Sequence, residues 1–267
     1  MPSAAHVSYP ADGVGLILID NPPMNFATWE LMEQIEAAVQ AVKAAGSRVV
    51  VLASDLPGYF IAHASLVDLV AAFSGGQPSG DGRVWYRLLK ELQTGSMIAL
   101  AANNGQAWGG GSEISWACNL RIAAQSATYG QPESLLGIIP GAGGTTRLAR
   151  LLGPARCLEM ILEGAPITAQ QALQWGAINR VVPDGRLRQE TLAWAARIAA
   201  LPAWAIEACK RSLLEGLDLP LDDALRNEGK IFGSVATRDD TLQIMRDAQS
   251  KYDAGANSVE ALGLSRD

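Results

Sequence analysis

The sequence predicts an α/β core followed by a helical C-terminal lobe, and two observations support this prediction. Up to Val182, short apolar runs that end at turn residues alternate with segments of helical periodicity. Beyond Pro154, predicted strands become rare and helical stretches dominate. Hydrophobic residues make up 49% of the 267 residues and charged residues 18%, so the chain can form a large buried core. We expect residues 1–200 to form the α/β core with the active site, and residues 201–267 to form the helical lobe.

Five apolar runs have the length and the boundaries of buried strands. The first ends at Asn21-Pro22-Pro23, a group of residues that stops strands. The third runs straight into a glycine-rich segment, and the fourth comes shortly before another. The predicted strands cover residues 14–20, 48–53, 97–102, 120–124 and 178–182.

Helix boundaries are marked by capping residues. Residues 28–45 have apolar side chains at helical spacing, with Thr28 as N-cap and Gly46 as the stop. A flexible loop over residues 74–80 precedes a helical segment at 84–92. Residues 168–171 (TAQQ) fit a capping box, and Gly176 ends that short helix. From Leu187 onward we expect helical stretches separated at Pro202, at residues 216–220 and at Gly233, with fraying from Gly255.

Charge and cysteine content exclude several functional classes. The net charge of −6 argues against a nucleic-acid partner, because phosphate binding needs clustered Lys and Arg. The three cysteines are widely spaced and form neither a disulfide framework nor a metal-binding pair. Residues 1–6 lack the pattern of a signal peptide, and no apolar run is long enough to span a membrane. We therefore expect a soluble cytoplasmic protein with no metal site.

Two glutamates in glycine-rich segments are the candidate catalytic residues of the sequence. Glu113 ends the segment 108–113 (WGGGSE), and Glu133 ends the segment 130–133 (GQPE). Two carboxylates can divide general-acid and general-base work, and glycines let backbone N–H groups approach a substrate oxygen. Taken singly, each feature has a simpler explanation: three glycines often form only a tight turn, and an acidic residue suits the first turn of any helix. The glycine spacing does not fit a dinucleotide-binding fingerprint.

Together, these segments closely resemble the crotonase superfamily, and in particular its enoyl-CoA hydratases. The resemblance rests on residues 103–113 (NNGQAWGGGSE), 130–133, 136–148 (LGIIPGAGGTTRL), 167–172 (ITAQQA) and 176–182 (GAINRVV). It is clear from about residue 14 to residue 182 and generic after Pro202. The resemblance implies a spiral of ββα units with a helical C-terminal lobe that builds trimers or dimers of trimers.

The resemblance also implies roles for individual residues. Glu113 and Glu133 match the two carboxylates that hold the water molecule and exchange its protons. Gly110 matches one N–H donor of the oxyanion hole, and Ala64 in the segment 62–65 matches the other. Ala62, His63, Ser65, Trp108 and Gly109 match positions that line the route to the CoA thioester substrate.

Two positions depart from the family pattern. His63 replaces a glycine, and Ser65 replaces an aspartate, in the oxyanion segment. If the glycine's backbone had positive φ, His63 would be strained there. His63 is either a third acid–base group or, in the simpler interpretation, a side chain that shades the CoA entrance. The tail also lacks the family's common Phe-x-Glu-Lys-Arg pattern, so its help in CoA binding stays open.

The resemblance implies hydration of a trans-2-enoyl-CoA to a 3-hydroxyacyl-CoA, as in fatty-acid β-oxidation, without a metal or redox cofactor. Trp85, Tyr86, Leu88 and Leu89 are candidates for the acyl pocket, with Trp108 on its other side, although core packing explains them equally well. Two alternatives stay open: a Δ3,Δ2-enoyl-CoA isomerase, which needs one carboxylate, and a non-catalytic acyl-CoA binder. An RNA-binding relative is disfavoured, because the helix at 28–45 carries three glutamates and one lysine.

Overall fold

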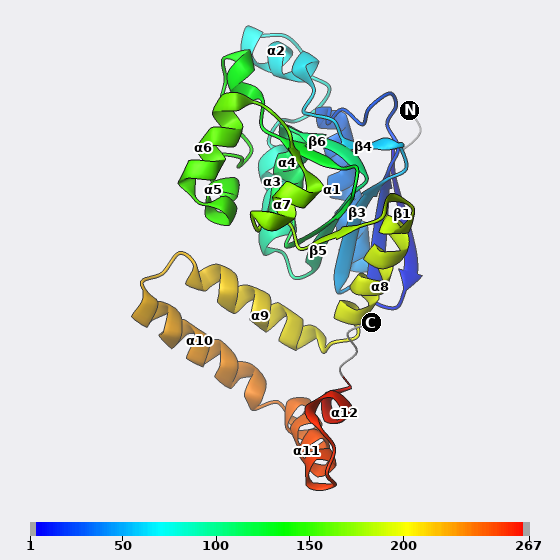
Figure 1. Ribbon diagram of the computed structural model, residues 1–267, viewed down its shortest axis with the longest axis vertical. Coiled ribbons are helices and arrows are strands. Elements are labelled where there is room, and N and C mark those ends of the chain that lie inside the picture. The colour runs from blue at the N-terminus through cyan, green and yellow to red at the C-terminus, as the bar shows by residue number, and fades with distance from the viewer. Residues whose placement is uncertain (1–3, 264–267) are drawn as a thin grey trace. The chain divides into compact units, whose positions relative to one another are not determined.

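The computed structural model describes residues 4–263. The chain forms two compact units, one ending at Leu201 and one starting at Pro202 (Figure 1). The expected lack of a signal peptide and the expected fraying rest partly on residues 1–3 and 264–267, which lie outside the described residues. The α/β class and the helical C-terminal region predicted from the sequence are confirmed. Within residues 4–263, no single helix is long and apolar enough to cross a membrane.

The first unit is built on two β-sheets. The larger has the strand order β1-β2-β3-β5-β7-β10, in which β1 is antiparallel to β2 and the other neighbours are parallel. The smaller has the order β4-β6-β8-β9, in which β4, β6 and β8 are parallel and β9 is antiparallel to β8. The larger sheet contains β1 (Ala5–Ala11), β2 (Val14–Ile19), β3 (Val49–Ser54), β5 (Ile98–Asn103), β7 (Leu120–Ala124) and β10 (Arg180–Val182). The smaller contains β4 (Gly58–Ile61), β6 (Gly105–Trp108), β8 (Thr128–Gly130) and β9 (Ile167–Thr168).

The chain alternates between these sheets in three successive turns. In each turn one strand enters the larger sheet, the next enters the smaller sheet, and a helix follows: β3-β4-α2, β5-β6-α4 and β7-β8-η1. This alternation is the spiral of ββα units that the resemblance implied. The helices of this unit are α1 (Trp29–Ala44), α2 (Leu66–Ser74), α3 (Val84–Thr94), α4 (Gly110–Ala117), α5 (Arg147–Leu152), α6 (Pro154–Glu163), α7 (Ala169–Gln174) and α8 (Leu187–Ala199), with the 3-10 helices η1 (Glu133–Leu136) and η2 (Asp184–Arg186).

The caps predicted from the sequence form as expected. The Thr28 hydroxyl accepts the Leu31 N–H at the start of α1, and Gly46 adopts φ of 76° just beyond its end. Thr168 and Gln171 form the predicted capping box of α7. The core lies between α1, α3 and the larger sheet, whose central strand β3 is buried along its whole length.

The second unit consists of α9 (Ala203–Gly216), α10 (Leu221–Ala236), α11 (Asp239–Asp253) and α12 (Ser258–Leu262), with α9 and α10 packed side by side (Figure 1). The predicted break at Gly233 is wrong, because α10 continues through it to Ala236. A glycine inside a helix costs only about 1 kcal/mol, which the packing of the helix can offset. The predicted fraying from Gly255 is also wrong for α12, which Asn257 and Glu260 start with a second capping box.

Candidate active site

Three site segments meet because three parallel strands end at the same edge of the smaller sheet. β4 leads into residues 62–65, β6 into Gly109 and Gly110, and β8 into residues 131–133. The pairing of Ile61 with Ala107 and of Trp108 with Gly130 brings the three carboxyl ends level. Ligands commonly bind outside the carboxyl ends of parallel strands, and here those ends supply both glutamates and both N–H donors predicted from the sequence.

The first N–H donor is held by a short pairing with the segment before α1. The Ala27 N–H donates to the His63 carbonyl at 2.9 Å, and the Ser65 N–H donates to the Ala27 carbonyl at 3.0 Å. The pairing thus uses the carbonyl of His63 and the N–H of Ser65, the two neighbours of Ala64. Because backbone groups alternate in direction along an extended segment, the Ala64 N–H points away from this pairing. The Ala64 N–H is therefore available to a ligand in the adjacent cavity.

The second donor stands at the first residue of α4. Gly110 lines the cavity, and its N–H has no helical carbonyl four positions earlier to donate to, so it is available to a ligand. A Cβ atom on Gly110 would lie 2.9 Å from the Ala64 Cβ, 3.1 Å from the Ala64 nitrogen and 2.7 Å from the Trp85 Cη2. The two donors are thus immediate neighbours, and only glycine fits at position 110.

Gly109 is required for a different reason. Its φ of 50° and ψ of −124° are unfavourable for residues with a side chain, and a Cβ there would lie 3.0 Å from the Glu133 Oε1. The turn from β6 into α4 therefore brings the backbone directly against the Glu133 carboxylate.

Glu113 lies in the first turn of α4 and is only 4% exposed. Its Oε1 accepts the Ala142 N–H at 2.7 Å and the Gly144 N–H at 2.8 Å. Burial, the largest effect, together with the charge of Glu133, raises the pKa of Glu113 to about 7, against the opposing effect of the two N–H groups and Arg147. Glu113 therefore holds its proton more strongly than an exposed glutamic acid does.

Glu133 begins η1 and is 8% exposed. Burial also raises its pKa, while the buried Gln131 amide, with its Nε2 at 3.3 and 3.5 Å from the two carboxylate oxygens, favours the ionised form. The negative charge of Glu133 also raises the pKa of Glu113, so ionisation of one carboxyl group disfavours ionisation of the other. Such a pair favours a state with one proton shared between two acids.

Both carboxyl groups open into one cavity of about 850 Å³. Apart from them, its described lining contains no charged side chain, because the other lining residues are apolar, glycine, or His63. The main apolar contributors are Trp29, Leu69, Phe73, Trp85, Trp108 and Ile139.

Seven of the nine predicted site residues line this cavity. They are His63, Ala64, Trp108, Gly109, Gly110, Glu113 and Glu133. Ala62 is fully buried beside the cavity without lining it. Ser65 instead caps α2, where its hydroxyl accepts the Asp68 N–H at 3.1 Å.

Of the predicted acyl-pocket residues on α3, Trp85 is the one that lines the cavity. Leu88 and Leu89 point into the core on the buried stripe of α3, and Tyr86 is 71% exposed. Tyr86 lies about 100° around the helix from Trp85, whereas Leu88 and Leu89 lie one turn along on the same side as Trp85 and pack in the core there.

His63 occupies its position without backbone strain. Among residues 4–263, Asn25 is the one non-glycine residue with positive φ, so the strain considered for His63 is absent. The His63 ring packs against Phe26 with centroids 4.6 Å apart, and its Nδ1 lies 2.7 Å from the Ala64 carbonyl oxygen. Because a carbonyl oxygen only accepts, Nδ1 carries the proton in this contact.

Sequence reasoning missed the loop that binds Glu113. The glycine-rich segment 141–144 is part of the family motif, yet no role was assigned to it, and its N–H groups approach Glu113 from about 30 positions further along the chain. The clustering of glycines was the available signal, because glycines allow close approach of backbone N–H groups. The sequence also gave no indication that Trp29 and Phe73 line the cavity.

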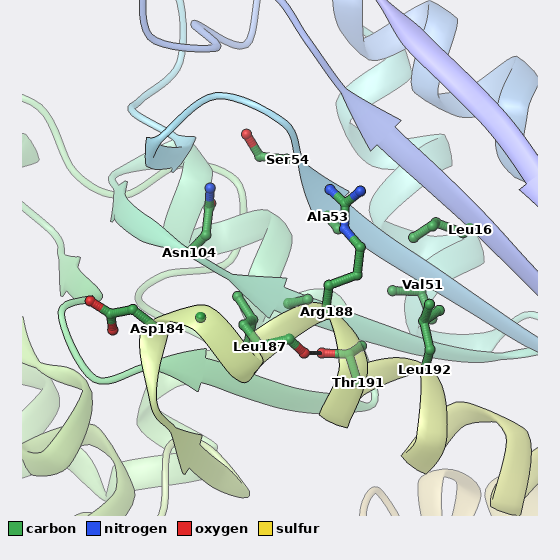
Figure 2. A pocket seen from close by; sticks show the side chains of 12 residues that line it. Leu16, Val51, Ala53, Ser54, Asn104, Asp184, Leu187, Arg188, Thr191 and Leu192 are labelled. Carbon is green, nitrogen blue, oxygen red and sulfur yellow. Dashed lines mark hydrogen bonds between the residues drawn. The ribbon is translucent and has the colours of Figure 1, made fainter. Parts of the chain in front are cut away.

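A second cavity of about 200 Å³ lies between α8 and the larger sheet (Figure 2). Its charged groups are already engaged within the protein, since Asp184 accepts the Ser126 N–H at 3.0 Å and Arg188 pairs with Asp55 at 2.5 Å, while the Asn104 Oδ1 has no hydrogen-bond partner among the described residues. It contains a single carboxylate and no pair of acid–base groups. The large cavity at the ends of β4, β6 and β8 is therefore the candidate active site.

Comparisons with known proteins agree with this geometry. The family model described as enoyl-CoA hydratase/isomerase matches residues 10–249. The chain belongs to the enoyl-CoA hydratase/isomerase family. It is 32% identical over 242 residues to a probable enoyl-CoA hydratase of Rhizobium meliloti, covering 87% of this chain and 90% of the relative. It is also 32% identical to a crotonyl-CoA hydratase of Syntrophomonas wolfei, covering 85% of this chain and 88% of that one.

The fold agrees as well. The crystal structure of an enoyl-CoA hydratase from Bacillus anthracis superimposes with a TM-score of 0.84 at 30% sequence identity, covering 93% of this chain and 96% of the other. The recognition of the crotonase superfamily from sequence motifs is thereby confirmed.

Proposed function

We propose that this member of the family is an enoyl-CoA hydratase, which adds water syn across the double bond of a trans-2-enoyl-CoA to give a 3-hydroxyacyl-CoA. The observation that carries the proposal is the placement of two buried, interacting carboxyl groups in one cavity with two adjacent N–H donors. An isomerase needs a single carboxylate, whereas addition of water needs one group to take a proton and another to give one.

In the proposed mechanism, the Ala64 and Gly110 N–H groups bind the thioester oxygen. They polarise the conjugated system, make Cβ electrophilic and stabilise the enolate formed on addition. Hydrogen bonds of this kind act strongly in a cavity with few polar groups, because little water competes for the developing charge.

Glu113 and Glu133 together handle the water and its protons. The ionised member of the pair removes a proton from water as the oxygen bonds to Cβ, and the protonated member delivers a proton to Cα. One proton is taken up and one is given, so the pair ends with the same total charge and regains its starting state by proton exchange. The chemistry requires no metal or redox cofactor, and the proposal includes none.

The cavity lining supports an acyl group without a charged end. A carboxylate at the far end of the chain would lose water and meet no cationic partner among the described lining residues, at a cost of several kcal/mol. We therefore expect crotonyl-CoA and longer trans-2-enoyl-CoAs to be hydrated much faster than an enoyl-CoA with a terminal carboxylate.

The test is a substrate panel with carboxamide variants. Purified protein is assayed for loss of the conjugated thioester absorbance, with formation of the 3-hydroxyacyl-CoA checked by mass spectrometry. Glu113→Gln and Glu133→Gln should each lower kcat by about 10²–10⁴-fold, as loss of an acid–base group does. Glu159→Gln on the exposed face of α6 is the matched control and should keep full activity. A Glu113→Gln variant with full rate would exclude the two-carboxylate mechanism.

The same assay separates the alternatives. An isomerase would convert a 3-enoyl-CoA to the conjugated thioester without taking up water. A non-catalytic binder would retain acyl-CoA in equilibrium binding yet turn over neither substrate. Either outcome would replace the hydratase proposal.

We also propose a homotrimer or a dimer of trimers in the cytoplasm, with a role in fatty-acid metabolism. The helical unit supports an oligomer, because it carries large apolar side chains that are exposed in the single chain: Leu213, Leu217, Leu225, Phe232, Ile244 and Met245. Light scattering coupled to size-exclusion chromatography tests the proposal, and a monomer at micromolar concentration would refute it.

A further inference from the structure

Arg147 lies directly behind the loop that binds Glu113. From the first turn of α5, its Nη1 donates to the Ala142 carbonyl at 2.8 Å, and its Nε donates to the Gln93 Oε1 at 2.8 Å. The guanidinium thereby connects the loop with α3, the helix that carries Trp85. Ala142 in turn donates its N–H to the Glu113 carboxylate, so two hydrogen bonds in series link Arg147 to Glu113.

The loop is shaped around this guanidinium. Gly143 has φ of 115°, and a Cβ atom there would lie 2.2 Å from the Arg147 Nη1. The Arg147 N–H donates to the Gly143 carbonyl at 2.6 Å, which closes the loop onto the start of α5. Position 143 therefore requires glycine both for its backbone angles and for the close contact with Arg147.

Arg147 also acts on Glu113 through its charge. Its positive charge favours the carboxylate form of Glu113, and the negative charge of Glu113 favours the guanidinium. The other titratable groups around Glu113 are Glu133 from η1, His63 across the cavity, and the Cys157 thiol of α6, which contacts the Gly144 carbonyl at 3.6 Å. Among these groups, Arg147 carries a positive charge that hydrogen bonds to the 141–144 loop hold in place.

We propose that Arg147 is a positioning residue for the reaction: it holds the 141–144 loop against Glu113 and fixes a positive charge next to the loop that binds this carboxyl group. The proposal rests on the hydratase function proposed above. Arg147 does not line the cavity, so it acts on the acid–base pair without touching the substrate.

Three substitutions separate the charge of Arg147 from its hydrogen bonds. Arg147→Lys keeps the charge with a single donor group, Arg147→Gln keeps a donor without the charge, and Arg147→Met removes both. Arg150→Met, one turn further along α5 and on its exposed side, is the matched control. Circular dichroism establishes which variants fold, and if Arg147→Met does not, the comparison of Lys with Gln decides.

For the charge effect, we expect the acid limb of the kcat/KM profile to move up by about one pH unit in Arg147→Met and Arg147→Gln. The rate in the limb region then falls about tenfold, with KM nearly unchanged. The limb should stay in place in Arg147→Lys and in the Arg150→Met control. An unmoved limb in both neutral variants would overturn the proposal, and so would an equal shift in Arg147→Lys.

A measurement without substrate keeps this test independent of the proposed function. The infrared band of the protonated Glu113 carboxyl, assigned by its absence in Glu113→Gln, is followed against pH in the wild type and in the neutral variants. We expect the band to persist to higher pH when Arg147 is neutral, and an unchanged titration would overturn the proposal. If the wild type hydrates no enoyl-CoA, the hydratase function fails while this titration still decides the role of Arg147.

Discussion

Substitution of Gly110 by alanine tests the oxyanion hole most directly. The added methyl group would lie 2.9 Å from the Ala64 Cβ, 3.1 Å from the Ala64 nitrogen and 2.7 Å from the Trp85 Cη2. Carbon atoms in contact normally lie about 3.5–4.0 Å apart, so Ala64, Trp85 or the start of α4 has to shift. A movement of the Trp85 ring alone leaves both contacts with Ala64 in place, so Ala64 or the start of α4 has to move and takes one N–H donor away from the thioester oxygen.

The expected size follows from the loss of one donor. Removing a single oxyanion-hole hydrogen bond lowers kcat by about 10²–10³-fold, equivalent to about 2.7–4 kcal/mol in the barrier. Gly141→Ala is a suitable control, because Gly141 lines the same cavity and its added methyl would meet nothing closer than the Ile139 carbonyl at 3.9 Å. Both variants are assayed with trans-2-hexenoyl-CoA, and their melting temperatures are compared with that of the wild type.

A Gly110→Ala enzyme with kcat within about threefold of the wild type would refute the reasoning, because that corresponds to well under 1 kcal/mol. An equal loss in Gly141→Ala would also refute it, since the effect would then come from crowding of the cavity in general.

Three further predictions follow from the same contacts. The pKa of Glu113 in the folded protein, about 7, lies above the usual 4.5, so the contribution of Glu113 to stability is fully present below about pH 4.5 and is lost as the pH rises through 7. Glu113→Gln should therefore raise the free energy of unfolding by about 1–3 kcal/mol at pH 8 and by little at pH 4.5. Urea titration at both pH values measures this difference. Asp68→Ala removes the acceptor of the Trp29 N–H at 3.0 Å and of the Ser79 N–H at 2.6 Å. It should destabilise the protein by about 2–4 kcal/mol and speed proteolysis of the loop before α3. Unchanged cleavage kinetics would contradict the idea that Asp68 holds this loop in place. His63→Ala breaks the contact of its ring with the Ala64 carbonyl and should lower kcat about three- to tenfold, as loss of one hydrogen bond does, while an unchanged kcat with a raised KM would place His63 only at the CoA entrance.

Most of the fold follows from local patterns in the sequence. The Thr28 and Thr168 caps and the buried strand at residues 49–54 depend on interactions within a few positions, so spacing and residue type are enough to predict them. Gly233 was misinterpreted because glycine weakens a helix without ending it when the flanking residues still favour one. β1 was missed, since its polar and exposed positions lack the apolar run of a buried strand.

The site could be predicted only in part, because its contacts join distant segments. Glu113 and Glu133 could be proposed from the family motif, but their mutual influence depends on the alignment of β6 with β8. The hydrogen bonds from Ala142 and Gly144 to Glu113, and the contact of Arg147 with Gln93 across 54 positions, have no local signal. Packing between distant segments likewise determines which side chains of α3 line the cavity: Leu88 packs in the core, whereas Trp85 lines the cavity.

The three turns of the spiral place the proposed catalytic groups on separate stretches of chain. The first turn provides the Ala64 donor, the second provides the Gly110 donor with Glu113, and the third provides Glu133. Because both glutamates lie just beyond strand ends and outside the smaller sheet, replacing one of these side chains leaves the strand pairing and the two backbone donors in place. A scaffold organised in this way can exchange one acid–base group at a time while it keeps the means to stabilise an enolate.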